Sequence, residues 1–304
     1  MCSFKWGLAL AFWAIVGGGV WAVTVVSSLP TLAHFAQVIG GDRVSVVSLS
    51  SGREDPHSLM VKPSMVSKIR QADLVLLVGM DLDPWMNELI KLAGKQSVQL
   101  GQMGYLDFSS TSVKRMGVMS PADLVKLKGY EHIHPNGNPH YWLSIDNAKV
   151  MVNRLTEVLS QLDPEGRSQF QLRNQAFQQE LTTLKRNVQA KAAPLRGKQI
   201  LVIHDAWVYF LDNMGLSIQA SLEEAPGISP GPLHLANILS QIKAKKLDVL
   251  LVDQYAGSRY DAYIKTLKKA GCPTAKLSQS TTSQYPTYQT LIQYNLQSML
   301  DAIQ

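Results

Sequence analysis

Short apolar runs alternate with helical patterns along almost the whole chain after residue 22, and this alternation restricts the fold more than any other feature of the sequence. The runs VTVVSS (23–28), DLVLLVG (73–79) and DVLLVD (248–253) carry apolar side chains at half or more of their positions. Continuous apolar strands separated by helices indicate parallel sheets that helices cover on both faces. We therefore predict an α/β fold.

The β/α pattern occurs twice. Expected strands of the first group cover 23–28, 43–50, 73–79 and the short run 97–100, and those of the second cover 198–204, 217–223, 248–253 and 275–278. Between the groups, Pro164 stands at the first position of a helical pattern that runs to about Ala192. A helix of roughly 28 residues would be about 42 Å long.

We accordingly predict two lobes, 23–163 and 194–304, each a parallel β-sheet flanked by helices. One long rigid helix at 164–193 would join them. A helix resists twisting more than a pair of loops does, so we expect small movements between the lobes instead of wide hinge closure.

The first 22 residues differ from the rest. Lys5 is followed by WGLALAFWAIVGGGVWA, which carries no charge. A short basic start, an apolar stretch and small residues before a cut site are typical of a secretory signal peptide. We expect cleavage after Ala22 and a periplasmic mature chain. The alternative is an uncleaved anchor, because 6–26 nearly reaches the ~20 apolar residues that span a bilayer.

Composition excludes some classes of partner and site. The 304 residues are 46% hydrophobic and 17% charged, as in an ordinary globular protein, and removing residues 1–22 would lower the net charge only from +6 to +5. We find no Lys/Arg-rich run with interleaved aromatic residues, so nucleic acid is a poor candidate partner. Cys2 and Cys272 are the only cysteines. A metal site would therefore not be built of thiolates.

Three histidines stand at positions that suit a metal site. His57 follows Asp-Pro, His140 follows Asn-Pro, and His204 ends the apolar run ILVI. Ligands of open parallel sheets gather at the carboxyl ends of strands. Neutral imidazole is the commonest protein ligand for borderline transition metals. A single such histidine would be more typical of a loop or core residue, but three together favour a shared ion.

The residues around these histidines carry a resemblance to a known family. The segments that match, spread over nearly the whole mature chain, are SSLPTLAHFAQVIGGDRV, EDPHSLMVKPSMVSKIRQADLVLLVGMDLDPWM, GNPHYWLSIDNAKVM, IHDAWVYF, EEAPGISPGPLHLANIL and TYQTLIQYN. The chain resembles the zinc/manganese-binding solute receptors of bacterial ABC transporters, the group that includes the high-affinity zinc receptors.

The resemblance implies two α/β lobes, a rigid connecting helix and a metal held between the lobes. It implies that His57 and His140 come from the first lobe and His204 from the second. Family members that prefer manganese often have a glutamate where His204 stands. The histidine therefore favours zinc, in line with the affinity of imidazole for that ion.

The chain departs from the family at the fourth ligand. Many members place an aspartate in the loop before the last helix, whereas KLSQSTTSQYPTYQ holds no acid. Glu223, in LEEAPG, is our candidate, since its position resembles a glutamate in one family subgroup. A surface acid beside a turn is the other interpretation of Glu223. A bound water is the next option for the fourth position, and Asp253 is a weaker one.

Two further histidines, His132 and His134, lie in a polar stretch where many zinc receptors of this family have a longer loop rich in histidine and acid. They could capture zinc transiently or orient the site, and the alternative is that both are solvated loop residues.

These features together predict a periplasmic receptor, not an enzyme, that binds Zn²⁺ and delivers it to an ABC transporter permease in the inner membrane. We expect a monomer. One alternative is a manganese or iron receptor of the same fold. The other is a zinc-dependent hydrolase with Glu54 or Asp55 as base, although the sequence has no HExxH motif.

Overall fold

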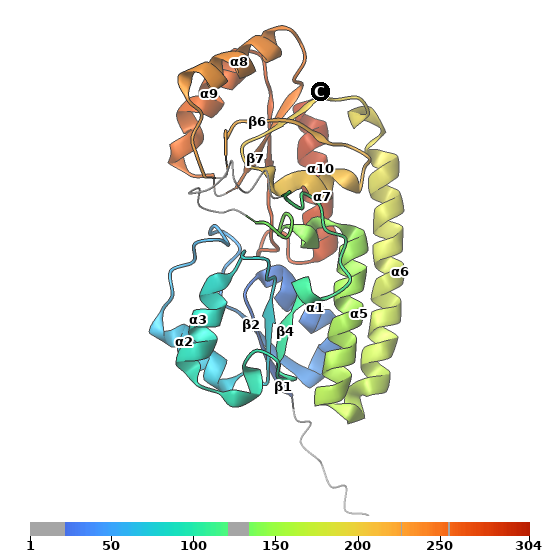
Figure 1. The fold of residues 1–304 in the computed structure, drawn as a ribbon. Helices are drawn as coiled ribbons and strands as arrows, with labels where there is room; N and C mark the ends of the chain where they lie inside the picture. Colours follow the sequence, from blue (N-terminus) through green and yellow to red (C-terminus); the bar gives the residue numbers. More distant parts are fainter. Residues whose placement is uncertain (1–21, 121–133, 226, 255) are drawn as a thin grey trace, which may run out of the picture.

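The computed structural model describes all residues except 1–21, 121–133, 226 and 255. Two four-stranded sheets lie at the centres of two lobes, and the helix α6 (Arg167–Lys191) runs along both (Figure 1). This arrangement confirms the predicted α/β class and the long helix. Within the described residues, no helix is both long enough and apolar enough to cross a bilayer. The expected signal peptide lies, apart from Ala22, outside the described part.

The first sheet has the strand order β2-β1-β3-β4, and all its pairs are parallel. Its strands are β1 (Val23–Ser27), β2 (Val44–Ser48), β3 (Leu74–Leu77) and β4 (Tyr105–Asp107). In β3, Val75 and Leu77 face one apolar cluster while Leu74 and Leu76 face another. A strand buried on both faces explains why its sequence is continuously apolar.

The fourth strand of this sheet is not the one that we predicted. Residues 97–100 do not form a strand, because Gln96–Val98 is a short 3₁₀ helix. The edge strand is instead Tyr105–Asp107, in register with Val75 opposite Tyr105. In the run 97–100 only Val98 is buried, so this segment lacks the apolar face that a sheet strand requires.

The second sheet repeats the topology with the order β6-β5-β7-β8, again all parallel. Its strands are β5 (Ile200–Val202), β6 (Ile218–Ser221), β7 (Val249–Asp253) and β8 (Thr274–Leu277). All four were predicted, with ends that differ by at most two residues. Because all strands of the sheet are parallel, their carboxyl ends lie at the same edge, where the loops that follow them gather.

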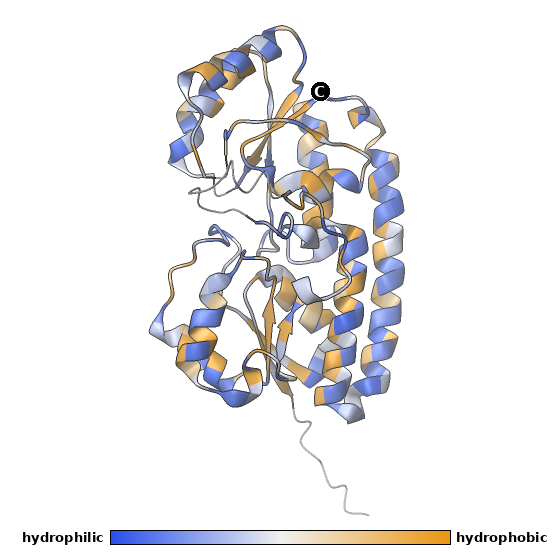
Figure 2. Ribbon diagram, viewed as in Figure 1, coloured by the Kyte–Doolittle hydropathy of each residue, from blue (hydrophilic) through white to orange (hydrophobic). Residues whose placement is uncertain are grey.

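Helices cover both faces of each sheet. They are α1 (Pro30–Gly40), α2 (Pro63–Gln71), α3 (Pro84–Ala93), α5 (Ile145–Leu162), α6, α7 (Val208–Asp212), α8 (Pro232–Lys243), α9 (Asp261–Lys269) and α10 (Tyr288–Ala302). Separate apolar clusters lie under α2 and α3 in the first lobe and under α8 and α9 in the second. Figure 2 shows apolar residues on the strands and hydrophilic residues along much of the outer surface of α6.

The largest apolar cluster is continuous between the lobes. It holds residues of β1 and β3 from the first sheet, of β5 and β7 from the second, and of the helices α1, α5, α6 and α10. On α6, Phe177 is 1% exposed and packs edge-on against Phe35 with ring centroids 6.1 Å apart. A shared core of this kind opposes large movement of one lobe against the other.

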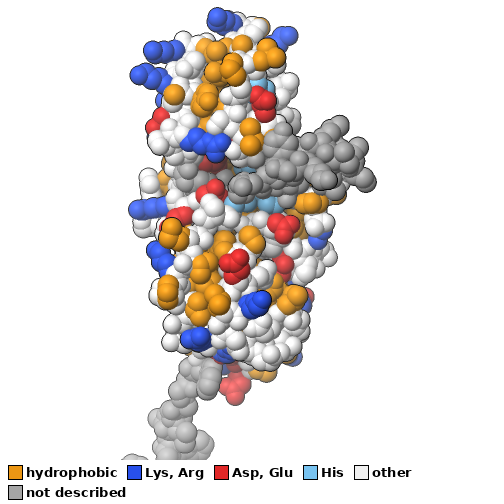
Figure 3. All heavy atoms as spheres, turned by 60° about the vertical axis from the view of Figure 1, so that its left-hand side comes forward, with side chains coloured by type: hydrophobic (Ala, Val, Ile, Leu, Met, Phe, Trp, Pro, Cys, Tyr) orange, Lys and Arg blue, Asp and Glu red, His pale blue; other side chains and the backbone are white. Residues whose placement is uncertain are grey.

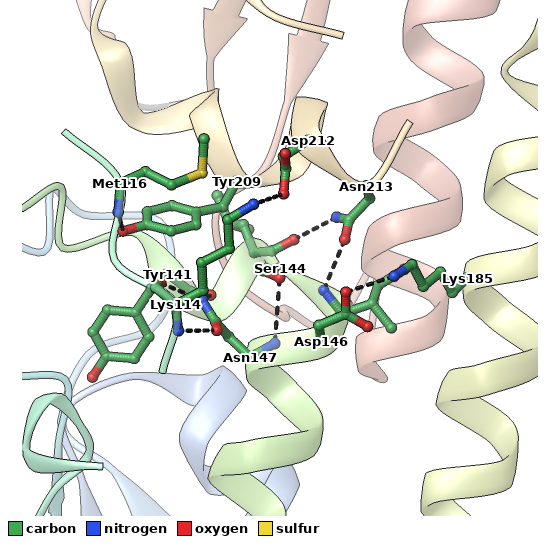
Figure 4. A network of polar contacts seen from close by, with 12 residues as sticks. Lys114, Met116, Tyr141, Ser144, Asp146, Asn147, Lys185, Tyr209, Asp212 and Asn213 are labelled. Carbon is green, nitrogen blue, oxygen red and sulfur yellow. Dashed lines mark hydrogen bonds and ion pairs between the residues drawn. The ribbon is translucent and has the colours of Figure 1, made fainter. Parts of the chain in front are cut away.

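Polar contacts reinforce the junction beside this core (Figure 4). The side chain of Asn213 accepts a hydrogen bond from the backbone of Ile145 at 3.0 Å and donates one to the carbonyl of Leu143 at 2.9 Å. The hydroxyl of Tyr209 donates to the carbonyl of Asn138 at 2.8 Å. These bonds tie α7 of the second lobe to the segment that carries His140.

Candidate metal centre

Imidazoles from three distant segments meet between the lobes. The ring centroids of His57 and His140 lie 5.3 Å apart, those of His140 and His204 5.6 Å, and those of His57 and His204 6.0 Å. One ring nitrogen of each lies within 4.8 Å of the other two. Rings bound to one tetrahedral zinc through bonds of about 2.0–2.1 Å have centroids roughly 5 Å apart. The three rings are therefore close to the arrangement that a shared ion requires.

Each of these histidines follows a strand of one of the two sheets. His57 lies in the loop between β2 and α2, His140 between β4 and α5, and His204 two residues after β5. Figure 3 shows histidine side chains at the waist of the molecule, with acidic side chains near them. The structure thus brings the three side chains together in loops that follow strands.

Asn138 fixes the orientation of the His140 ring. Its Nδ2 donates to the carbonyl of Asp205 at 3.0 Å, so its Oδ1 faces His140 and lies 3.0 Å from Nδ1 of that ring. An amide oxygen only accepts, so Nδ1 carries the proton and Nε2 keeps a lone pair. Burial, aided by the neighbouring His57 and His204, lowers the pKa of His140 well below its ordinary value. The ring is therefore neutral and ready to bind a metal.

A rigid turn places His57. The backbone N–H of His57 donates to Oδ1 of Asp55 at 2.9 Å. The indole of Trp85, on α3, donates to the carbonyl of Pro56 at 3.0 Å. The loop is thus held by a local turn and by a bond to α3 just before the histidine.

Glu223 holds the His204 ring from behind. Its Oε2 lies 3.1 Å from Nδ1 of His204 and also accepts from the backbone N–H of Gly227 at 3.1 Å, while its Oε1 accepts from the hydroxyl of Tyr260. Both oxygens are occupied. A carboxylate that bonds the far nitrogen of an imidazole in this way orients the ring and makes it a better metal ligand.

The same contacts set the charges of the His204–Glu223 pair. Burial alone would lower the pKa of His204, but the hydrogen bond to Glu223 and the nearby carboxylates of Asp205, Glu223 and Asp253 raise it to about 9. Burial alone would raise the pKa of Glu223, but the bonds from His204 and Tyr260 lower it. His204 is therefore protonated at pH 7, and a metal must displace that proton.

The histidines line a pocket of about 190 Å³ between the lobes. The remaining lining residues are Asp55, Ile203, Glu223, Gly227, Asp253, Ala256, Arg259, Tyr260 and Gln279. Nε2 of Gln279 donates to Oδ1 of Asp253 at 2.7 Å. Burial raises the pKa of Asp253 to about 6, although the bond from Gln279 and the charge of His204 act against it. Asp253, the weaker candidate for the fourth position, thus has one oxygen occupied.

The structure describes His134 but not His132. The ring of His134 lies beside that of His57, with centroids 5.1 Å apart. His134 is buried and so is not a solvated loop residue. His132 lies outside the described residues, and the prediction about its role stays a prediction.

Sequence analysis missed the residues that orient the ligands. Asn138 could have been found, because an asparagine two positions before a functional residue can bond its backbone N–H, as it does at His140. Tyr260, which bonds Glu223, and Gln279, which bonds Asp253, could not be found, because each reaches the pocket from a segment distant in sequence.

A comparison with family profiles decides the family. The profile described as zinc-uptake complex component A, periplasmic, named ZnuA, matches residues 25–302. The chain belongs to the ZnuA family. Members of this family are periplasmic solute receptors and not enzymes, and they deliver metal to an ABC transporter permease. The zinc-hydrolase alternative is therefore excluded.

Individual relatives agree with this assignment. The high-affinity zinc uptake system protein ZnuA of Yersinia pestis is 26% identical over 237 residues, which cover 74% of this chain and 73% of that protein. A crystal structure of ZnuA superposes with a TM-score of 0.76 at 22% identity, covering 93% of this chain and 100% of the other. The solute-binding protein FpvC of Pseudomonas aeruginosa, in complex with Mn²⁺, gives 0.75 at 23% identity, covering 93% and 98%. These structures show the fold.

Proposed function

We propose that this chain captures Zn²⁺ between its lobes through His57, His140 and His204 and releases it to an ABC transporter permease in the inner membrane. The observation that carries the proposal is the set of three imidazole nitrogens within 4.8 Å of one another. Donors from both lobes contribute to it, as a receptor that holds its cargo between two lobes requires.

Glu223 belongs to the same centre in this proposal. Its bond to Nδ1 of His204 leaves Nε2 of that ring for the ion and adds a negative charge behind it. Because the other oxygen of Glu223 accepts from Tyr260, we assign Glu223 to holding His204 in place. This role supports metal affinity without a direct bond to the ion.

The donor set favours zinc over manganese. Imidazole nitrogen suits zinc, whereas manganese prefers sites rich in carboxylate and water. For divalent ions of the first row, affinity at nitrogen donors rises from manganese toward zinc. A site whose converging donors are all imidazoles is therefore selective against Mn²⁺.

The proposal also covers the location of the protein and its oligomeric state. Residues 1–22 have the pattern of a secretory signal peptide, and we propose that cleavage after Ala22 releases the mature chain into the periplasm. We also propose that it acts as a monomer, since one chain supplies all three imidazoles.

Equilibrium dialysis of the purified mature chain tests this function. With Zn²⁺ and Mn²⁺ at equal free concentrations, we expect one zinc per chain and little manganese. His140→Ala should abolish zinc binding at concentrations that saturate the parent. His234→Ala is the matched control, because His234 lies on α8 outside the pocket. Retention of zinc by the His140 variant, or preference for manganese, would contradict the proposal.

A further inference from the structure

His134 has the burial and hydrogen bonding of a metal-binding histidine. The side chain is buried, with 8% of the residue exposed, and its Nδ1 lies 2.9 Å from the carbonyl oxygen of Met80. A carbonyl oxygen only accepts, so Nδ1 carries the proton and Nε2 holds a lone pair. Among the described residues, Nε2 has no hydrogen-bond partner. Buried polar atoms without a partner are rare and each needs an explanation.

The position of this ring suits the neighbouring site. Its centroid is 5.1 Å from that of His57, with an angle of 37° between the ring planes. This separation matches the roughly 5 Å expected between imidazoles on one tetrahedral zinc, and it is shorter than the separations among the other three rings.

The segment that carries His134 is held firmly at the site. The backbone N–H of Gly137 donates to the carbonyl of His134 at 3.1 Å, and that of Asn138 donates to the carbonyl of Met116 at 2.7 Å. The same short turn continues to His140. One turn therefore presents two imidazoles, both with Nδ1 hydrogen-bonded to an oxygen and Nε2 left as the donor to a metal.

The other candidates for the fourth position are less suitable. Both oxygens of Glu223 are occupied, and Asp253 accepts from Gln279. Oε1 of Gln279 is also buried without a partner among the described residues. It is, however, a neutral amide oxygen, which zinc binds less readily than imidazole nitrogen.

We propose that Nε2 of His134 is the fourth ligand and that the zinc centre of this chain is built from four imidazoles. The proposal rests on the function proposed above. His134 is outside the group of donors within 4.8 Å of one another, so a side-chain rotation must bring its Nε2 onto the ion. Such a centre has neutral ligands only, with Glu223 and Asp253 supplying negative charge from behind.

X-ray absorption at the zinc edge tests this, because it counts imidazoles around the bound ion. We expect four in the zinc-loaded mature chain, and three plus one oxygen ligand without an imidazole ring in His134→Asn. Asparagine keeps a donor for the carbonyl of Met80 and removes only the metal-binding nitrogen, so this variant should fold. Gln279→Ala, which removes the rival amide oxygen, should leave the count at four, and so should the matched control His234→Ala, whose side chain lies outside the pocket. We also expect His134→Asn to weaken zinc binding by more than the ~10–100-fold typical of residues that only orient a ligand.

Three imidazoles in the parent, unchanged in His134→Asn, would overturn this inference while leaving the proposed function in place. A fall in the ligand count in Gln279→Ala instead would assign the fourth position to Gln279 and would also overturn it. Failure of the parent chain to bind zinc at all would refute the proposed function itself, so the two failures are distinguishable.

Discussion

Replacing Glu223 by glutamine should change how zinc binding depends on pH. The two side chains have nearly the same shape, so Glu223→Gln removes the charge behind His204 and leaves the packing in place. In the parent, the hydrogen bond and charge of Glu223 help to raise the pKa of His204 to about 9. Without them, burial acts on His204 with less opposition, and its pKa should fall toward or below the ordinary value of about 6.5.

The size of the effect follows from the proton that zinc displaces. With a pKa of about 9 for His204, competition from this proton weakens the apparent affinity of the parent at pH 7 by about 100-fold. The apparent affinity should therefore rise about tenfold per pH unit between pH 7 and 8.5. In Glu223→Gln this competition largely disappears, but the lost contact costs roughly 10–100-fold. The two affinities should thus be similar near pH 7 and diverge as pH rises.

Competition with a chelator of known pH dependence measures these slopes. Calorimetry in two buffers of different ionisation enthalpy counts the protons released, and we expect about one from His204 in the parent at pH 7.5 and close to none from it in the variant. Parallel slopes in the two proteins would refute the reasoning, as would a parent whose affinity does not change between pH 7 and 8.5.

Three further changes test the fold and the site. Burial lowers the pKa of His34 to about 4, so between pH 6.5 and 4 the unfolded chain binds a proton at this residue that the folded chain does not. Acidification from pH 7.5 to 4.5 should remove about 2.5 kcal/mol of stability through His34, and urea unfolding of His34→Leu should show a loss smaller by about that amount. Trp142 lies with its ring centroid 5.3 Å from that of His140, so most of the change in tryptophan fluorescence on adding zinc should vanish in Trp142→Phe. Phe177→Ala should lower the free energy of unfolding by about 3–5 kcal/mol, because it opens a cavity under α6; a loss below 1 kcal/mol would show that the shared core is not formed as described.

Strands with a continuous apolar run could be predicted from sequence, whereas the short edge strand β4 could not. The central strands β3 and β7 are buried on both faces and so carry an unmistakable pattern. The edge strand β4 has three residues, of which only Leu106 is buried. β4 becomes a strand because it pairs with β3, and the sequence of β4 itself gives no sign of that pairing. The sequence alone therefore favours the run at 97–100 instead.

The candidate ligands could be predicted for a similar reason. Proline before His57 and His140, and a strand before His204, are local features that place a side chain at a sheet edge. The roles of Glu223 and Gln279 depend on their hydrogen-bond partners, which come from other segments of the chain. Sequence placed Glu223 at the centre, but only the coordinates show that both its oxygens are already hydrogen-bonded.

An anomalous-difference map, recorded at the zinc edge from crystals of the zinc-loaded mature chain, tests the central claim most directly. The account predicts one strong peak between the lobes, about 2.0–2.1 Å from a ring nitrogen of each of His57, His140 and His204. A peak bound elsewhere on the chain, or one that any of these three rings does not reach, would contradict it.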